Sequence, residues 1–355
     1  MLKSKFDFIL LSLVLALGSI SVLVIYSINK NLAASQIIFW LIGLLVLAIS
    51  SSIGYQNWQK LYLGLYFFSV ISLLAVLFFA GPVRGSVRWI DLGPFRFQPS
   101  EIAKIASIFL LAFYFKDRTA KKLKNLILGF LLILPAFVLI FLEPDIGNAL
   151  ALAAIWFGIT LAAGFRAKVF TILLLGVIML SVFGYSLIAP YQKERIATFI
   201  NPGTDPLGKG YNIIQAKIAV GSGEFFGRGL GRGSQSQLNF LPEGESDFIF
   251  AAIAEQLGFV GAGLLIIIFT AMAVRVLNTA KNSNRYAQLI IIGAFSYLIF
   301  QFGVNVGMNM GLVPVTGITL PLVSYGGSSL ISTLFLAGVV LQIKRTQKTT
   351  YFHIR

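Results

Sequence analysis

Long apolar runs separated by short polar segments dominate the hydropathy pattern of this chain. A helix needs about 20 apolar residues to cross the roughly 30 Å hydrocarbon core of a bilayer. The pattern therefore predicts an all-α polytopic membrane protein with ten transmembrane helices. Their expected ranges are 8–28, 37–55, 61–80, 101–115, 125–142, 146–164, 168–190, 248–274, 287–308 and 328–343.

Two ranges have unusual starts. The fourth is short and polar at its beginning, where Pro99 predicts a helix start. The tenth follows Pro321 and the Gly326–Gly327 pair, so we expect irregular backbone before it. Residues 191–246 form one large loop between the seventh and eighth spans, and residues 1–355 are expected to be a single transmembrane domain.

Composition agrees with this class and excludes several chemistries. Hydrophobic residues make up 57% of the chain and charged residues 12%, whereas soluble domains carry about a quarter charged residues. The chain has no Cys, and its single His is His353, near the end. Disulfides, thiolate metal sites and a Ser–His–Asp triad are therefore not expected, and no metal-ligating cluster is predicted.

The formal net charge of +15 is explained by topology. If the N-terminus is cytoplasmic, most Lys and Arg residues of the short loops fall on the cytoplasmic side, as the positive-inside rule requires. Both termini are then cytoplasmic, the loop 191–246 is extracytoplasmic, and no nucleic-acid partner is implied. Of the 13 Asp and Glu residues, only Asp7 and Asp117 lie on the inner side. Any polar chemistry is therefore expected on the outer face.

A first group of candidate residues surrounds the fourth span. Arg88 precedes it, and Glu101 and Lys104 lie three apart on one helical face. A charge about one turn inside a membrane helix is costly unless it is paired or snorkels. Lys104 is therefore either half of a structural ion pair or a cation kept to meet an anionic head group. The turn Glu143–Pro144–Asp145 is interpreted as a tight connection in which Asp145 caps the next helix.

The long loop supplies Arg195 and Lys217 as further cations. Alternate glycines between Gly227 and Gly233 resemble a phosphate-binding loop, but no preceding strand or nucleotide-binding spacing supports that interpretation. Tyr211, with the apolar residues that follow it, suits a short amphipathic helix on the membrane surface.

The segment Leu241–Ala251 carries the strongest candidate. Asp247 lies where the loop becomes a span, so it is either the N-cap of that helix or a functional carboxylate. Together with Glu243 and Glu245, it places three carboxylates within five residues at a low-dielectric boundary. Repulsion there raises carboxylate pKa values, which suits a general base. Glu255, deeper in the span, must be paired, protonated or beside water.

The ninth span has two stripes that repeat every four residues. Gly303, Gly307 and Gly311 suggest close helix packing. Gln301, Asn305 and Asn309 form a polar stripe suited to a cavity or to an interhelical hydrogen bond.

These motifs resemble the SEDS family (shape, elongation, division and sporulation proteins), and its rod-shape branch more than its division branch. The resemblance covers nearly the whole chain in order. The matching stretches are Arg88–Lys104, Pro144–Gly147, Gly221–Gly233, Leu241–Ala251 and Pro321–Gly327. Three positions depart from the family pattern: Asn148 where Thr is usual, Glu224 where Gly is usual, and Gln256 where a second Glu often follows Glu255.

The resemblance implies a peptidoglycan glycosyltransferase of the bacterial cytoplasmic membrane that acts on lipid II at the extracytoplasmic face. Its catalytic aspartate falls on Asp247, and Glu101 and Lys104 match positions in the family's outward-facing cavity. The implied partners are the growing glycan strand, a class B penicillin-binding protein (a transpeptidase) and membrane proteins of the elongation complex.

The residue inventory suits this reaction. A diphosphate leaves as a stable anion, so one base and several cations suffice, unlike the two carboxylates of a glycosidase. We expect Asp247 to be the base and Arg88, Lys104, Arg195 or Lys217 to neutralise the diphosphate, together with a divalent cation (Mg or Mn); Glu243 is a further substrate-binding candidate. The alternatives are a lipid II flippase and a non-catalytic scaffold for the transpeptidase.

Overall fold

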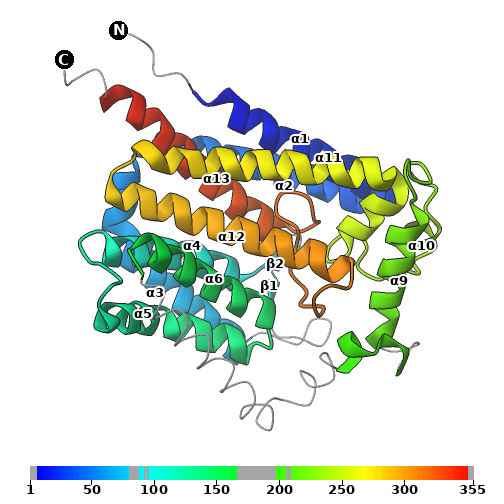
Figure 1. Cartoon of the computed structure of the whole chain (residues 1–355), viewed down its shortest axis with the longest axis horizontal. Helices are drawn as coiled ribbons and strands as arrows, with labels where there is room; N and C mark the ends of the chain where they lie inside the picture. The colour runs from blue at the N-terminus through cyan, green and yellow to red at the C-terminus, as the bar shows by residue number, and fades with distance from the viewer. Residues whose placement is uncertain are drawn as a thin grey trace.

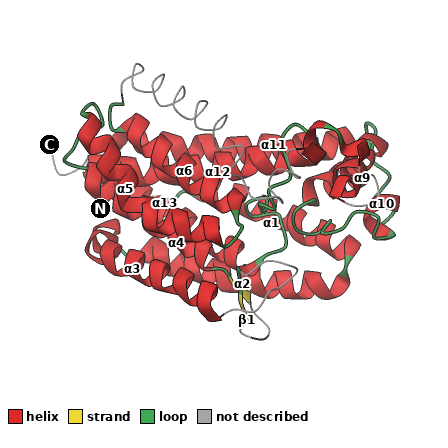
Figure 2. Ribbon diagram, turned by 90° about the horizontal axis from the view of Figure 1, so that it is seen from below, coloured by secondary structure: helices red, strands yellow, loops and turns green. Residues whose placement is uncertain are grey.

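The computed structural model describes residues 6–79, 88–91, 93, 96–165, 197–204 and 209–350. This part of the chain is mainly helical (Figures 1 and 2). The helices are α1 (Phe8–Ile28), α2 (Lys30–Ser52), α3 (Tyr55–Phe79), α4 (Pro99–Phe115), α5 (Leu123–Leu142), α6 (Ile146–Ala162), α9 (Lys209–Ser222), α10 (Ser234–Gln237), α11 (Ile249–Thr279), α12 (Arg285–Asn309) and α13 (Gly327–Thr350). Two 3-10 turns, η1 (Pro202–Thr204) and η2 (Ala280–Asn282), and a two-stranded hairpin of β1 (Ile90–Asp91) and β2 (Arg96–Phe97) accompany these helices.

Seven helices in the described part of the chain are long and apolar enough to cross a membrane: α1, α2, α3, α5, α11, α12 and α13. Nine of the ten predicted ranges each overlap a helix, and α6 is apolar but only 17 residues long. The seventh predicted range, 168–190, lies outside the described residues. The chain is therefore a multi-pass membrane protein. The total of ten spans, the cytoplasmic position of both termini and the single-domain assignment stay predictions.

Helix ends differ from the predicted ranges where polar side chains act locally. The second span begins at Lys30, seven residues earlier than predicted, because the side chain of Asn29 accepts the N–H groups of Asn31 and Leu32. Such capping satisfies backbone donors that hydropathy does not detect. The predicted start at Pro99 is confirmed, and α13 begins at Gly327 directly after irregular backbone, as expected.

Helix α4 lies at the centre of the bundle, in contact with α3, α5, α6, α12 and α13. Nearly all its side chains are buried, including the polar Ser100, Glu101, Lys104 and Ser107. Because α4 faces protein rather than lipid, it can be short and can carry charged groups at membrane depth. This position explains why the fourth predicted span is polar at its start.

Glycines allow close helix packing, but Gly303 of the predicted stripe is not one of them. A Cβ on Gly338 of α13 would meet Ser50 Oγ and lie 2.5 Å from the backbone oxygen of Leu47 on α2. Gly303, by contrast, is exposed, and a Cβ there would meet nothing within 4 Å. The packing prediction is wrong for Gly303, because spacing alone does not show which face of α12 meets another helix.

The described ends of the chain lie together, and helices α9 and α10 lie at the opposite end of the molecule (Figure 1). Near the ends, Asp7 pairs with Arg275 of α11 at 3.0 Å, and Gln347 of α13 donates to the backbone oxygen of Thr279 at 2.6 Å. The N-terminal end of α11, beside Asp247, lies far from this cluster.

Helix α11 is broken at Gly258, whose φ of +67° is outside the helical region. The loop after α9 fills the break. Arg228 and Gly229 donate their N–H groups to the backbone oxygens of Glu255 and Gln256. A Cβ on Gly258 would collide with the backbone nitrogen of Gly227, itself at φ +82°. Glycine is therefore required at both positions.

Candidate functional site

Asp247 is half-buried at the N-terminal end of α11, but it is not the N-cap of that helix. The N-cap position is Phe248, which has no side chain able to cap. The buried N–H of Ala251, in the first turn of α11, is instead accepted by the side-chain oxygen of Asn309 on α12, at 2.9 Å. The N-cap interpretation of Asp247 is therefore wrong, and the residue is only partly buried.

The backbone before α11 is held at three successive carbonyl groups. The oxygen of Glu245 accepts the N–H of Tyr325 at 2.8 Å, and the oxygen of Ser246 accepts the hydroxyl of Ser324 at 2.6 Å. The oxygen of Asp247 accepts the side-chain amides of both Asn305 and Asn309, each at 3.0 Å. Such complete pairing of backbone acceptors fixes the direction in which the Asp247 side chain leaves the loop.

Gly317, in the irregular segment after α12, lies between Asp247 and Arg88. An ideal Cβ on Gly317 would be 3.4 Å from Asp247 Oδ2 and 4.0 Å from Arg88 Nη1. The carboxylate and the guanidinium therefore border the same small space, which any side chain at residue 317 would enter. Gly317 was not among the residues predicted from the sequence. Its backbone φ of +71°, which favours glycine, is visible only in the structure.

Arg88 also connects this space to a buried polar network. Its Nη1 lies 3.7 Å from Asp145 Oδ1, and the side chain of Asp145 is fully buried. Gln98 donates to Asp145 Oδ2 at 3.1 Å, and Asn148 donates to the same oxygen at 2.8 Å. Asp145 also accepts the N–H of Asn148 at 3.2 Å, so the predicted capping role of Asp145 is confirmed.

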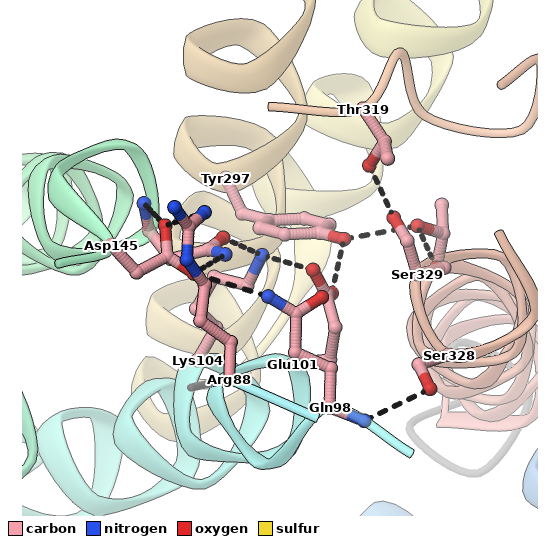
Figure 3. Close-up of polar contacts among 11 residues, drawn as sticks. Arg88, Gln98, Glu101, Lys104, Asp145, Tyr297, Thr319, Ser328 and Ser329 are labelled. Carbon is pink, nitrogen blue, oxygen red and sulfur yellow. Dashed lines mark hydrogen bonds and ion pairs between the residues drawn. The ribbon is translucent and has the colours of Figure 1, made fainter. Parts of the chain in front are cut away.

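Lys104 lies deeper in the same network (Figure 3). Its ammonium donates to Glu101 Oε1 and to Asn148 Oδ1, both at 2.7 Å, and it lies 5.0 Å from the centre of the Tyr297 ring. Lys104 is 0% exposed and Glu101 is 2% exposed. The predicted pairing across one helical face is therefore present. In this conformation neither group reaches a substrate at the surface of the site.

Glu143 belongs to the turn between α5 and α6, outside both helices, and it is fully buried. Neither of its carboxyl oxygens has a hydrogen-bond partner among the described residues. Burial, and to a lesser extent the negative charge of Asp145, raise the pKa of Glu143 to about 9 although Arg88 acts to lower it. Glu143 is therefore a neutral carboxylic acid at pH 7.

The remaining predicted site residues lie apart from the buried network. Glu243 is half-buried in the loop before Asp247 and accepts the hydroxyl of Ser246 at 2.9 Å. Lys217 is exposed on α9, with its ammonium beside Gly311 at the end of α12. The amphipathic helix predicted there is confirmed as α9, and its contact with a membrane stays a prediction. Arg195 lies outside the described residues.

Glu255 is explained by a local contact. Its carboxylate is fully buried and accepts the backbone N–H groups of Gln235 and Ser236 at 2.7 and 3.0 Å. Glu255 therefore caps the short helix α10 with its side chain, so of the three predicted alternatives (paired, protonated or beside water) the structure shows a carboxyl group that is paired by hydrogen bonds. Across the described ranges, no three Asp, Glu or His side chains gather closely enough to hold a metal ion.

Comparisons with known proteins match nearly the whole length of the chain. A family model described as "Cell cycle protein", FTSW_RODA_SPOVE, matches residues 4–349. Stage V sporulation protein E of Bacillus subtilis is 35% identical over 97% of this chain and 98% of its own length. Peptidoglycan glycosyltransferase MrdB of Escherichia coli K12 is 36% identical over 98% of this chain and 95% of its own length.

Solved structures show the same fold. One similar chain comes from a structure described as the structural coordination of polymerization and crosslinking by a peptidoglycan synthase complex. It has a TM-score of 0.85 and 31% sequence identity, and the match covers 97% of this chain and 98% of that chain. The rod shape determining protein RodA of Thermus thermophilus has a TM-score of 0.74 and 28% identity over the same shares.

Proposed function

This chain belongs to the FtsW/RodA/SpoVE family of cell cycle proteins, and from that premise we propose that it is a peptidoglycan glycosyltransferase. The match confirms the resemblance to the SEDS family that the sequence motifs carried. Relatives similar over nearly their full length are named for this enzyme, including MrdB and probable FtsW proteins. The proposed reaction joins lipid II disaccharide units into β-1,4 glycan strands.

The proposed base is Asp247. Its carboxylate takes the proton from the 4-hydroxyl of the acceptor N-acetylglucosamine as that oxygen attacks the anomeric carbon of the donor. The bond from that carbon to the diphosphate breaks, and the diphosphate leaves as an anion. A single displacement of this kind converts an α-linked donor into a β-linked product. The observation that carries the assignment is the half-buried Asp247 on a backbone held at three successive carbonyls, with α11 capped by Asn309 instead.

Arg88 is the proposed first contact for the diphosphate. Its guanidinium borders the space beside Gly317 that Asp247 also borders, so it can stabilise negative charge developing next to the base. Lys217, which is exposed on α9, and Arg195, which lies outside the described residues, remain candidates for the outer part of the diphosphate, and Glu243 for the sugar. Because Lys104 and Glu101 are enclosed, we assign them to support of Asp145 and Arg88 rather than to direct contact.

A divalent cation (Mg or Mn) at the lipid diphosphate is part of the proposal. The described residues supply no three-ligand cluster for it, so the diphosphate itself would provide much of its coordination. The steps above need only the side chains of this chain and the substrate.

The proposed setting is the bacterial cytoplasmic membrane, with both termini cytoplasmic and the site on the extracytoplasmic face. The solved relative in a peptidoglycan synthase complex supports a partner that crosslinks the strands, and we propose a class B penicillin-binding protein for this role. We also propose, from the stretch Phe97–Lys104, that this chain belongs to the rod-shape branch of the family. The overall identity does not distinguish the branches, because a sporulation protein, a probable FtsW and MrdB are all 35–36% identical to this chain.

The decisive experiment compares Asp247→Asn with Glu245→Gln, which removes a carboxylate from the same loop. Each purified protein is incubated with lipid II, with and without the transpeptidase partner, and glycan strands are measured. We expect Asp247→Asn to lose about 10²–10⁴-fold in rate and Glu245→Gln to remain near the unchanged protein. A folded Asp247→Asn protein that polymerises normally would refute the assignment. A flipping assay on the same variant, sampling both leaflets, separates this enzyme from a lipid II flippase, and full activity of Asp247→Asn in the complex would favour a scaffold.

A further inference from the structure

The polar stripe of α12 meets the loop of Asp247. Asn305 and Asn309 are both fully buried, and each donates its side-chain amide to the backbone oxygen of Asp247 at 3.0 Å. The interhelical hydrogen bond that the spacing of this stripe predicted is therefore present, and its acceptor is the residue proposed as the base.

Asn309 performs a second task at the same place. Its side-chain oxygen accepts the N–H of Ala251, one of the donors that the first turn of α11 leaves without an intrahelical partner. A carboxylate at Asp247 would ordinarily be drawn to these donors as a cap. Because Asn309 accepts the N–H of Ala251 from another helix, this donor does not need the Asp247 side chain.

Asn305 connects the base to the other wall of the site. Its amide also donates to the backbone oxygen of Ile318 at 2.7 Å. Ile318 follows Gly317, the residue whose missing Cβ leaves the space between Asp247 and Arg88. One side chain on α12 therefore sets the separation between the loop that carries the base and the segment that borders the leaving group.

We propose that Asn305 and Asn309 are positioning residues that hold the Asp247 carboxylate toward the acceptor hydroxyl. This inference rests on the proposed function of Asp247 as base. Neither amide touches the carboxylate, so both act through the backbone. Since misplacement of a reacting group by about 1 Å can cost about 10²-fold in rate, loss of either amide affects turnover more than substrate binding.

Gln301 gives a matched control on the same stripe. It lies one turn before Asn305 on α12 and is fully buried, yet neither its amide nitrogen nor its oxygen has a hydrogen-bond partner within the described ranges. Gln301→Leu therefore removes a buried amide from the same helix face without disturbing Asp247.

The test measures kcat and KM for lipid II polymerisation and the melting temperature of Asn305→Leu, Asn305→Asp, Asn309→Leu and Gln301→Leu. We expect the three Asn variants to lose about 10–100-fold in kcat with KM within about twofold, and Gln301→Leu to keep both. In an Asp247→Asn background, Asn305→Leu should cause no further loss of rate, because no base remains to be positioned.

The outcomes separate this inference from the proposed function. If Asp247→Asn stays active, both fail. If Asp247→Asn is inactive but the folded Asn variants turn over normally, only the positioning role fails. That role also fails if KM rises with unchanged kcat, or if none of the Asn variants folds while Gln301→Leu does, since the pair would then be a structural support alone.

Discussion

The ammonium of Lys104 donates a 2.7 Å hydrogen bond to the side-chain oxygen of Asn148, 44 residues further along the chain. Asn148 in turn donates to Asp145, which faces Arg88 at the edge of the site. Two cations, Arg88 and Lys104, thus share one network with the carboxyl groups of Glu101 and Asp145, and Glu143 interacts with this network by charge alone. The raised pKa of Glu143 keeps this carboxyl protonated at pH 7, so it adds no negative charge beside Asp145.

Removal of the buried cation should destabilise the protein. In Lys104→Met, the carboxylate of Glu101 loses its ion-pair partner while it stays buried, a change that costs about 3–5 kcal/mol. We expect a clear fall in the melting temperature of the purified protein. The exposed Lys60 offers a control, since Lys60→Met should melt like the unchanged protein. Equal melting temperatures for both variants would contradict a structural role for the ion pair.

Stability should fall with rising pH because of Glu143. Its pKa rises from an ordinary 4.5 to about 9 on folding, so between these values the folded protein keeps a proton that the unfolded chain has released. The stabilisation is complete below about pH 4.5 and is lost as the pH rises toward about 9.

Glu143→Gln keeps the neutral shape at every pH. We expect its melting temperature to depend less on pH than that of the unchanged protein, and to be higher at about pH 8.5. The comparison uses thermal unfolding from about pH 6 to about pH 9. Parallel curves for the two proteins would show that Glu143 is already ionised in the folded state.

The broken helix α11 should tolerate glycine replacement at one position and not at another. Gly258→Ala places a Cβ 2.6 Å from the backbone oxygen of Phe225 at a left-handed φ, whereas Gly263 of the same helix has nothing within 4 Å. Strain of this kind costs about 1–3 kcal/mol before any clash is counted. We expect Gly258→Ala to lower the melting temperature and Gly263→Ala to leave it unchanged or raise it. A stable Gly258→Ala protein would mean that the loop at Gly227 can move aside.

Arg88 should matter for turnover in a way that its neighbour Arg96 does not. Arg88 lies two residues before β1 (Ile90–Asp91) and Arg96 is the first residue of β2 (Arg96–Phe97). Arg88 borders the site, whereas the Arg96 side chain is 52% exposed. Removing a donor that stabilises developing negative charge costs about 10²–10³-fold in kcat. We expect Arg88→Gln to show such a loss with lipid II and Arg96→Gln to show little. Equal activities would exclude Arg88 as the contact for the leaving group.

Helix positions followed from the sequence because an apolar run of membrane length is a local property. The range 8–28 coincides with α1, and the range 125–142 differs from α5 only at its start. The motif around Asp247 and the i, i+3 pair of Glu101 and Lys104 could also be identified from neighbouring residues alone. The capping role of Asp145 was predictable for the same reason.

The tertiary structure decided what each polar side chain faces. Sequence spacing placed Asn305 and Asn309 on one stripe, but their acceptor, Asp247, lies about 60 positions away in the chain. Whether Lys104 meets substrate or an internal partner depends on how completely α4 is enclosed by other helices. Hydrogen-bond partners and burial arise from packing between distant segments, whereas hydropathy, capping and helical spacing are set within a few turns. The sequence could therefore locate the helices and candidate groups, and only the packed bundle could assign the contacts among them.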